Sequence, residues 1–164
     1  MENYAQNMDP NHVPEEFKVP CDVIDLPSQG ILYPNKKSSV KVEYLTALDE
    51  NILTSPNLLN NGKFLDVLLE RKVKDLGFDI SDLLNGDRSA ILIYLRTTGL
   101  GAEYEQMVFN KSGDLVKGTI DLASLKTKEL EVQPDEKGEF DFVLPTSGKK
   151  IKFKFLTARD DDEI

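Results

Sequence analysis

Two residues with reactive side chains, His12 and Cys21, each occur only once in the 164-residue sequence. Nucleophilic triads, histidine-rich metal centres and histidine acid–base pairs all need an imidazole, so each would have to use His12. A lone cysteine can form neither an intrachain disulfide nor a multi-cysteine zinc site. We therefore expect Cys21 to pack as a small apolar residue. We expect no catalytic residue, no cofactor-binding residue and no metal ligand.

The other candidate chemical groups have simpler structural interpretations. Glu103 and Glu105 alternate on an expected strand and share one face, as glycosidase acids can, but no aromatic sugar platform lies nearby. Gly99 and Gly101 lack the third glycine and the preceding strand of a dinucleotide-binding loop, and a helix end explains them better. The acidic run 160–163 lacks the ligand spacing of a calcium loop. These patterns predict that the protein is not an enzyme.

The charged residues that point most clearly to a site are Asp87, Arg88 and Arg96, which flank an apolar run. Buried charges are costly unless they are paired. These residues therefore form an internal ion pair or exposed helix ends, or they anchor a protein interface, where arginine is enriched. Apolar side chains of the neighbouring expected helices would extend such a subunit contact. The candidate interface residues are Asp87, Arg88, Arg96, Tyr33, Leu58 and Leu59.

The net charge is concentrated at the two ends of the sequence. The formal net charge is −9, whereas residues 36–157 together carry only −1. A nucleic-acid-binding domain needs a basic stripe along the phosphates, and the lysine pairs at 36–37 and 149–150 are too few to form one. No stretch approaches the roughly 18 consecutive apolar residues that indicate a membrane-spanning helix. We expect neither nucleic acid nor a membrane as a partner.

Hydrophobic periodicity predicts an α+β fold with an N-terminal β-hairpin, a helical insert of about three helices and C-terminal antiparallel β-hairpins. Residues 1–19 are polar without an apolar period, which predicts a flexible N-terminal arm before a single domain over 20–164. The helical insert spans about 46–99 and the β-rich part about 103–157. The expected helices are 47–54, 62–76 and 87–98, with one further turn at 81–84. The expected strands are 21–26, 40–44, 104–109, 116–122, 129–132, 139–144 and 151–156.

Two segments of the sequence resemble each other. Leu26–Glu50 begins with LPSQG and ends with LTALDE, and Leu144–Asp161 begins with LPTSG and ends with LTARDD. Each contains a turn, an amphipathic strand, and a threonine followed three residues later by aspartate, which is the pattern of a helix capping box. A duplication and two independent hairpins explain this similarity equally well. Because an isolated helix start is unstable, we expect 160–164 to fray and the chain to be a truncated form of a longer protein.

Taken in order along the chain, these motifs resemble the T-even bacteriophage baseplate hub assembly protein family. The resemblance covers about residues 19–164. Residues 109–113 contain no cysteine where some relatives carry a Cys-x-x-Cys pair, so no zinc role transfers to them. The matching segments are Leu26–Gly30, Tyr33–Pro34, Leu45–Glu50, Asn61–Gly62, Leu83–Arg88, the helix exit 95–104 and the final hairpin 144–157.

The resemblance implies a non-enzymatic bacteriophage baseplate hub component or assembly factor that acts by protein–protein contacts in contractile tail assembly. Its expected partners are other hub or wedge subunits, and a homo-oligomer is a further expectation. Its expected location is the virion baseplate, or the host cytoplasm during phage assembly. The alternative is a chaperone-like adaptor or interaction module from another assembly system.

Overall fold

The body of the protein is built on a small antiparallel sheet. The computed structural model describes residues 19–60, 63–128, 130 and 132–162, so the expected N-terminal arm lies almost entirely outside the described residues. Strands β1 (Cys21–Asp25), β2 (Ser39–Glu43) and β3 (Val73–Lys74) pair in that order. Val40 and Val42 alternate along β2 and are buried, as period-two patterning requires when one face of a sheet meets a core.

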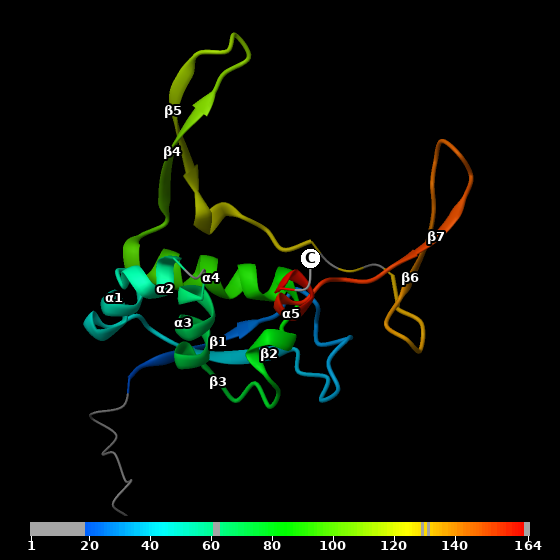
Figure 1. Cartoon of the computed structure of the whole chain (residues 1–164), viewed down its shortest axis with the longest axis horizontal. Coiled ribbons are helices and arrows are strands. Elements are labelled where there is room, and N and C mark those ends of the chain that lie inside the picture. The colour runs from blue at the N-terminus through cyan, green and yellow to red at the C-terminus, as the bar shows by residue number, and fades with distance from the viewer. Residues whose placement is uncertain (1–18, 61–62, 129, 131, 163–164) are drawn as a thin grey trace, which may run out of the picture.

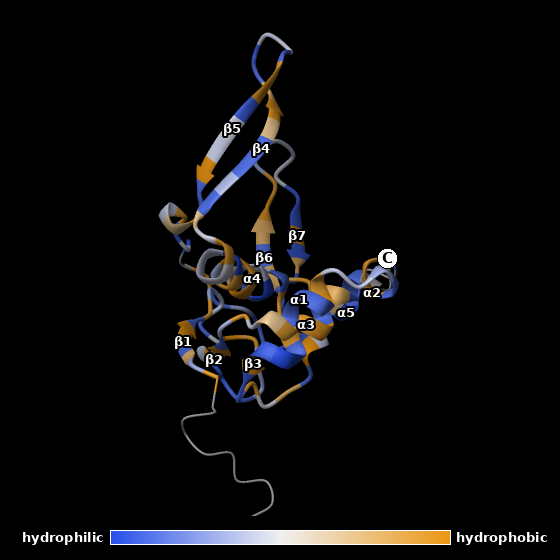
Figure 2. Ribbon diagram, turned by 90° about the vertical axis from the view of Figure 1, so that its left-hand side faces the viewer, coloured by the Kyte–Doolittle hydropathy of each residue, from blue (hydrophilic) through white to orange (hydrophobic). Residues whose placement is uncertain are grey.

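Helices cover the buried face of this sheet. They are α1 (Ala47–Leu53), α2 (Pro56–Asn60), α3 (Phe64–Lys72), the 3₁₀ turn η2 (Ile80–Asp82) and α4 (Asn85–Leu100). Figures 1 and 2 show the helices between the sheet on one side and two projecting hairpins on the other. One core joins the layers; its buried members are Leu26, Tyr33, Val40, Val42, Leu68, Leu69, Val73, Leu76, Ile80, Leu83, Leu84, Ile91 and Leu95.

A buried ion pair joins the start of α1 to the end of α3. Thr46 caps α1, because its backbone N–H and hydroxyl both donate to Oδ2 of Asp49, at 2.7 and 2.8 Å. The same oxygen lies 2.6 Å from Nζ of Lys72, and both side chains are almost completely buried. Burial alone would raise the pKa of Asp49, but the hydrogen bonds from Lys72 and Thr46 outweigh it and lower that pKa. Arg71 Nε lies 2.7 Å from the other carboxylate oxygen of Asp49, so two cations of α3 hold it to the start of α1.

Two hairpins leave the body on the same side (Figures 1 and 2). The long arm consists of β4 (Glu103–Phe109) and β5 (Leu115–Asp121) with their turn, and the 3₁₀ turn η3 (Leu122–Ser124) follows it. The short arm consists of β6 (Phe140–Val143) and β7 (Lys150–Phe153) with their turn. After β7 the chain returns to the body, where the last helix is α5 (Ala158–Asp162). In the described residues, no helix is long and apolar enough to cross a bilayer.

The α+β architecture agrees with the sequence prediction, and the differences are local. Helix α2 is not among the expected helices, because Pro56 predicts the end of a helix. Pro56 instead occupies the first position of α2, where its missing N–H costs nothing. The helix expected over 62–76 ends at Lys72, because Val73 and Lys74 pair with β2 instead. The strand expected over 129–132 falls partly outside the described residues, and Leu130 and Val132 lie in no strand.

The end of the described chain also corrects an expectation. Residues 158–162 form α5 rather than fraying, whereas 163–164 lie outside the described residues. The helix is held by tertiary contacts, because Leu84 and Thr157 form a β-bridge and Asn85 N–H donates to the Leu156 carbonyl at 2.9 Å. A short helix that is unstable alone is thereby stabilised by packing.

Candidate protein interface

The long arm is a two-stranded ribbon that exposes apolar side chains on both faces. The cross-strand pairs Tyr104–Ile120 and Val108–Val116 put four of them on one face, which we call its hydrophobic face. All four are exposed to solvent. A two-stranded ribbon is marginally stable unless its apolar face packs against another surface. The opposite face contains Glu103 and Glu105 near the base, and the exposed apolar residues Met107, Phe109 and Leu115 nearer the turn. The two carboxylates therefore lie on an exposed ribbon.

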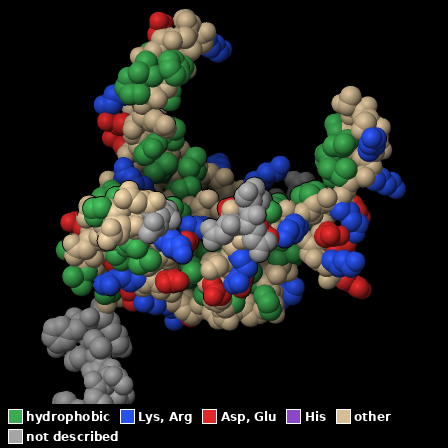
Figure 3. All heavy atoms as spheres, viewed as in Figure 1, with side chains coloured by type: hydrophobic (Ala, Val, Ile, Leu, Met, Phe, Trp, Pro, Cys, Tyr) green, Lys and Arg blue, Asp and Glu red, His purple; other side chains and the backbone are tan. Residues whose placement is uncertain are grey.

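The short arm also has a hydrophobic face. The pairs Phe140–Phe153 and Phe142–Ile151 form its hydrophobic face, which Phe155 extends toward the body. Phe140 is buried under Phe153 and Phe155, with ring centroids at 5.4 and 4.9 Å, whereas the other members of the face are exposed. In Figure 3 the hydrophobic side chains of the short arm lie on the side toward the long arm, and lysines lie on the outer side.

A cavity of about 480 Å³ opens where the short arm meets the body. Phe155 and Leu156 line one wall, and Leu84 at the start of α4 lines another. Pro27, and Leu130 and Val132 from the segment that joins the two arms, add to its apolar lining. Apolar concave surfaces of this kind are typical of sites that receive a protein side chain or a small apolar ligand.

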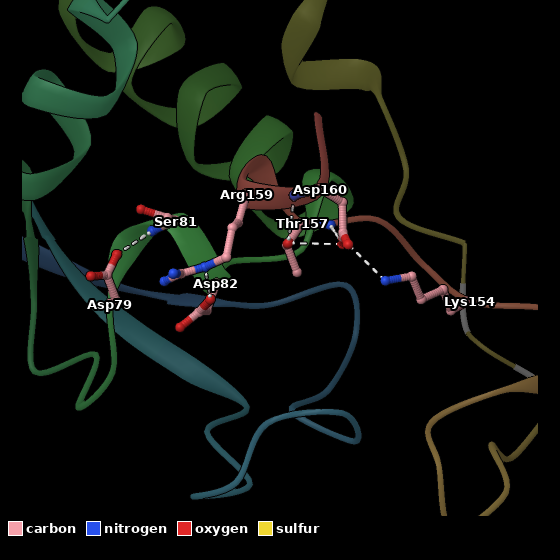
Figure 4. A network of polar contacts seen from close by, with 7 residues as sticks. All are labelled: Asp79, Ser81, Asp82, Lys154, Thr157, Arg159 and Asp160. Atoms are coloured by element: carbon pink, nitrogen blue, oxygen red, sulfur yellow. Dashed lines mark hydrogen bonds and ion pairs between the residues drawn. The ribbon is translucent and has the colours of Figure 1, made fainter. Parts of the chain in front are cut away.

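A polar network joins α5 to the end of the short arm and to the body (Figure 4). Asp160 accepts hydrogen bonds from Lys154 at 2.6 Å and from the N–H and hydroxyl of Thr157, both at 2.9 Å. The hydrogen bond from Lys154, followed by those from Thr157, lowers the pKa of Asp160 to about 2. Arg159 donates to Asp82 of η2 at 2.8 Å, which ties the same helix to the body.

Asp87 and Tyr33 lie inside the protein, which corrects their expected place on an interface. Asp87 is 1% exposed and Tyr33 is 3% exposed. Asp87 accepts hydrogen bonds from the N–H and hydroxyl of Ser28, at 2.8 and 2.6 Å, and from the Tyr33 hydroxyl at 2.6 Å. Burial, together with the hydrogen bond to Asp87, raises the pKa of the Tyr33 hydroxyl well above its ordinary range. The expected anchor is instead a clamp that holds the LPSQG turn against the first turn of α4.

The two arginines of the expected anchor also make contacts within the chain. Arg88 pairs with Asp66 of α3 at 2.7 Å, with Arg88 mostly buried and Asp66 partly exposed. Arg96 donates to the carbonyls of Gly101 and Glu103, at 2.7 and 3.3 Å, so it holds the base of the long arm. This geometry fits the structural interpretation of both residues, and a direct role for either in partner binding stays a prediction.

Leu58 and Leu59 are placed on α2, at the edge of the helical layer. Leu58 is half-buried, whereas Leu59 is exposed. An interface role for them stays a prediction. Neither residue belongs to the hydrophobic faces of the arms, so the structure offers two apolar surfaces that the candidate residues do not include.

The exposed faces of both arms were missed as interface candidates, although their alternating pattern was visible. Alternation predicts that Phe140, Phe142 and Leu144 face Ile151, Phe153 and Phe155 across the turn at 146–149. The register pairs Phe140 with Phe153 and Phe142 with Ile151, whereas Leu144 and Phe155 lie outside the paired strands. The alternating pattern does not show whether a second layer covers the strands.

No family model, curated protein or solved structure matches this chain. Among the described residues, no group of His, Cys, Asp and Glu is arranged to hold a metal ion.

Proposed function

We propose that this protein is a non-enzymatic component or assembly factor of a bacteriophage baseplate hub, acting through protein–protein contacts in contractile tail assembly. The observation that supports a contact function is the pair of arms with exposed hydrophobic faces. Contiguous exposed apolar surface of this kind marks protein interaction sites. The assignment to a baseplate hub rests on the order of the sequence motifs described above.

In this function the arms bind hub or wedge subunits and cover their apolar surfaces until these subunits reach their places. The body supplies the rigidity, because the Asp87 clamp holds the start of α4, the helix that leads into the long arm, and the Asp49–Lys72 pair joins α1 to α3. The same surface also fits a chaperone-like adaptor of another assembly system, and the identity of the bound partner separates the two functions.

Co-expression with single hub and wedge subunits tests the proposal. A tagged full-length chain should co-purify with at least one such subunit and elute with it as one species in size-exclusion chromatography. Val108→Asn together with Phe142→Asn, which alter both hydrophobic faces, should abolish co-elution. Lys117→Gln, on the opposite face of the long arm, is the matched control and should leave co-elution unchanged. Separate elution from every hub and wedge subunit would reject the baseplate function.

A further inference from the structure

The two similar segments fold into equivalent units. In the first unit, Leu26 N–H donates to the Ser38 carbonyl at 2.8 Å, one residue beyond the last pair of β1 and β2. In the second unit, Leu144 N–H donates to the Lys149 carbonyl at 2.9 Å, one residue beyond the last pair of β6 and β7. The strands, their register at the turn and the first turn hydrogen bond therefore correspond.

The helix starts correspond as well. Thr46 N–H donates to Asp49 Oδ2 at 2.7 Å before α1, and Thr157 N–H donates to Asp160 Oδ2 at 2.9 Å before α5. The capping residues are Thr46 and Thr157, so β2 aligns with β7 without a gap. This alignment places Val42 at the position of Phe153.

The units differ in what covers the sheet. In the first unit, Val42 is completely buried, and Leu68 and Leu69 of α3 lie in the same core. In addition, β3 pairs with β2 through Val42 and Val73. In the second unit, Phe153 is 39% exposed. Strand β7 pairs with β6 alone among the described strands, so its other edge offers backbone hydrogen-bonding groups.

The capping aspartates, Asp49 and Asp160, also differ in how far they are buried and in which cation pairs with them. Asp49 is sealed by Lys72, which comes from the end of α3, and its side chain is fully buried. Asp160 pairs with Lys154 from its own unit, and its side chain is 24% exposed. In the first unit, one helix-and-strand segment, α3 with β3, thus supplies the apolar cover, the added strand and the buried cation.

From this equivalence we infer that the short arm and α5 form a docking platform for a partner segment with the chemistry of α3 and β3. That segment is an amphipathic helix that ends in a basic residue and continues as a short strand. Its strand adds to the free edge of β7, its helix covers the phenylalanine face, and its cation approaches Asp160. The inference deepens the proposed function and rests on it for the partner being another protein.

The occupant is a different protein rather than a second copy of this chain. In each copy, Leu68 and Leu69 of α3 are buried in the core, and Lys72 is committed to Asp49. A second copy could therefore offer its own α3 and β3 only by unfolding its body. A partner whose helix and strand are accessible avoids that cost.

The probe is a synthetic peptide with the sequence of residues 63–77 of this chain, titrated to about 1 mM into the ¹⁵N-labelled full-length protein. Amide shifts should appear along β7 and from Thr157 to Asp160. Phe153→Ser in the protein should weaken binding by about tenfold or more. Because that variant could disturb the short arm, a peptide with Leu69→Asn provides a second test and should show the same loss. Lys117→Gln on the long arm, which lies outside the hydrophobic faces of both arms, is the control and should leave the affinity unchanged.

Charge gives an independent readout. A peptide in which Arg71 and Lys72 are both replaced by glutamine should bind a few-fold more weakly, and Asp160→Asn should remove that difference. Absence of binding, shifts confined to the long arm, or self-association of the protein through β7 without peptide would each overturn the inference. The experiment needs no hub subunit, so its failure is distinguishable from failure of the co-purification test.

Discussion

Replacement of Asp87 by alanine tests whether the candidate anchor is in fact an internal clamp. The carboxylate is 1% exposed and accepts three hydrogen bonds, two from Ser28 and one from Tyr33. Alanine would leave all three donors without their acceptor. The Ser28 N–H is fixed by the turn and cannot reorient, whereas the two hydroxyls can rotate.

The expected loss follows from these contacts. A buried donor without a partner costs about 1–3 kcal/mol. Because the two hydroxyls recover part of their loss by rotating, we expect Asp87→Ala to reduce the free energy of unfolding by about 3–5 kcal/mol. Asp87→Asn keeps one acceptor oxygen and should cost about 1–3 kcal/mol. A domain has about 5–15 kcal/mol in total, so the alanine variant should be close to unfolding.

Urea unfolding followed by circular dichroism measures this loss. With a denaturant slope of about 2 kcal/mol per molar, Asp87→Ala should lower the midpoint by about 2 M. The matched control is Asp66→Ala, which removes the partly exposed partner of Arg88 and should cost about 1 kcal/mol or less. A midpoint shift for Asp87→Ala no larger than the shift for Asp66→Ala would refute the clamp. If Asp87→Ala left the free energy of unfolding unchanged but abolished partner binding, Asp87 would be an interface residue.

Three further predictions concern the body and the base of the short arm. Lys72→Met should lower the free energy of unfolding by about 3 kcal/mol, because the buried Asp49 would keep only the half-exposed Arg71 as its cation. The double variant with Asp49→Asn should recover part of the loss in the same urea assay. Asp160 has a folded-state pKa of about 2 against its ordinary 3.8, so the stability that it contributes is present above about pH 4 and is lost as the pH falls toward 2. Asp160→Asn should therefore make the thermal unfolding midpoint less dependent on pH over that range. An unchanged pH dependence would contradict the role given to Asp160. Gly30 and Gly113 both have positive φ, but only at Gly30 would an added Cβ clash, at 2.5 Å from the backbone of Lys37. Gly30→Ala should therefore lower the free energy of unfolding, measured by thermal denaturation, by about 1–3 kcal/mol more than Gly113→Ala does.

Local patterns predicted much of the fold because they reflect contacts between near neighbours. The threonine–aspartate spacings at Thr46 and Thr157 predicted both capping boxes, which need only residues three apart. Alternation of apolar residues predicted the strands of both arms, and the apolar run after Asp87 predicted α4. Asp87 itself lies in the first turn of α4 rather than capping it, because Ser28 and Tyr33, far away in the chain, use its carboxylate.

Long-range contacts also explain the shorter α3. Its apolar period continues to Leu76, but Val73 pairs with Val42 of β2, and a residue cannot belong to a helix and a sheet ladder at once. Likewise, Lys72 has an ordinary position on a predicted helix, and only the packing of α3 against α1 makes it one of the most buried residues of the protein. The periodicity of a sequence does not show which surface a residue packs against in the folded protein.

Most of the helices and strands, the two capped helix starts and the internal similarity between Leu26–Glu50 and Leu144–Asp161 follow from the amino-acid sequence. That one of these equivalent units has a buried face and the other an open one follows from the packing of the whole chain. The physical reason is that strand patterning depends on each strand's own side chains, whereas burial depends on a second surface. In the first unit α3 supplies that surface, and among the described residues no element supplies it for Phe142, Ile151 and Phe153.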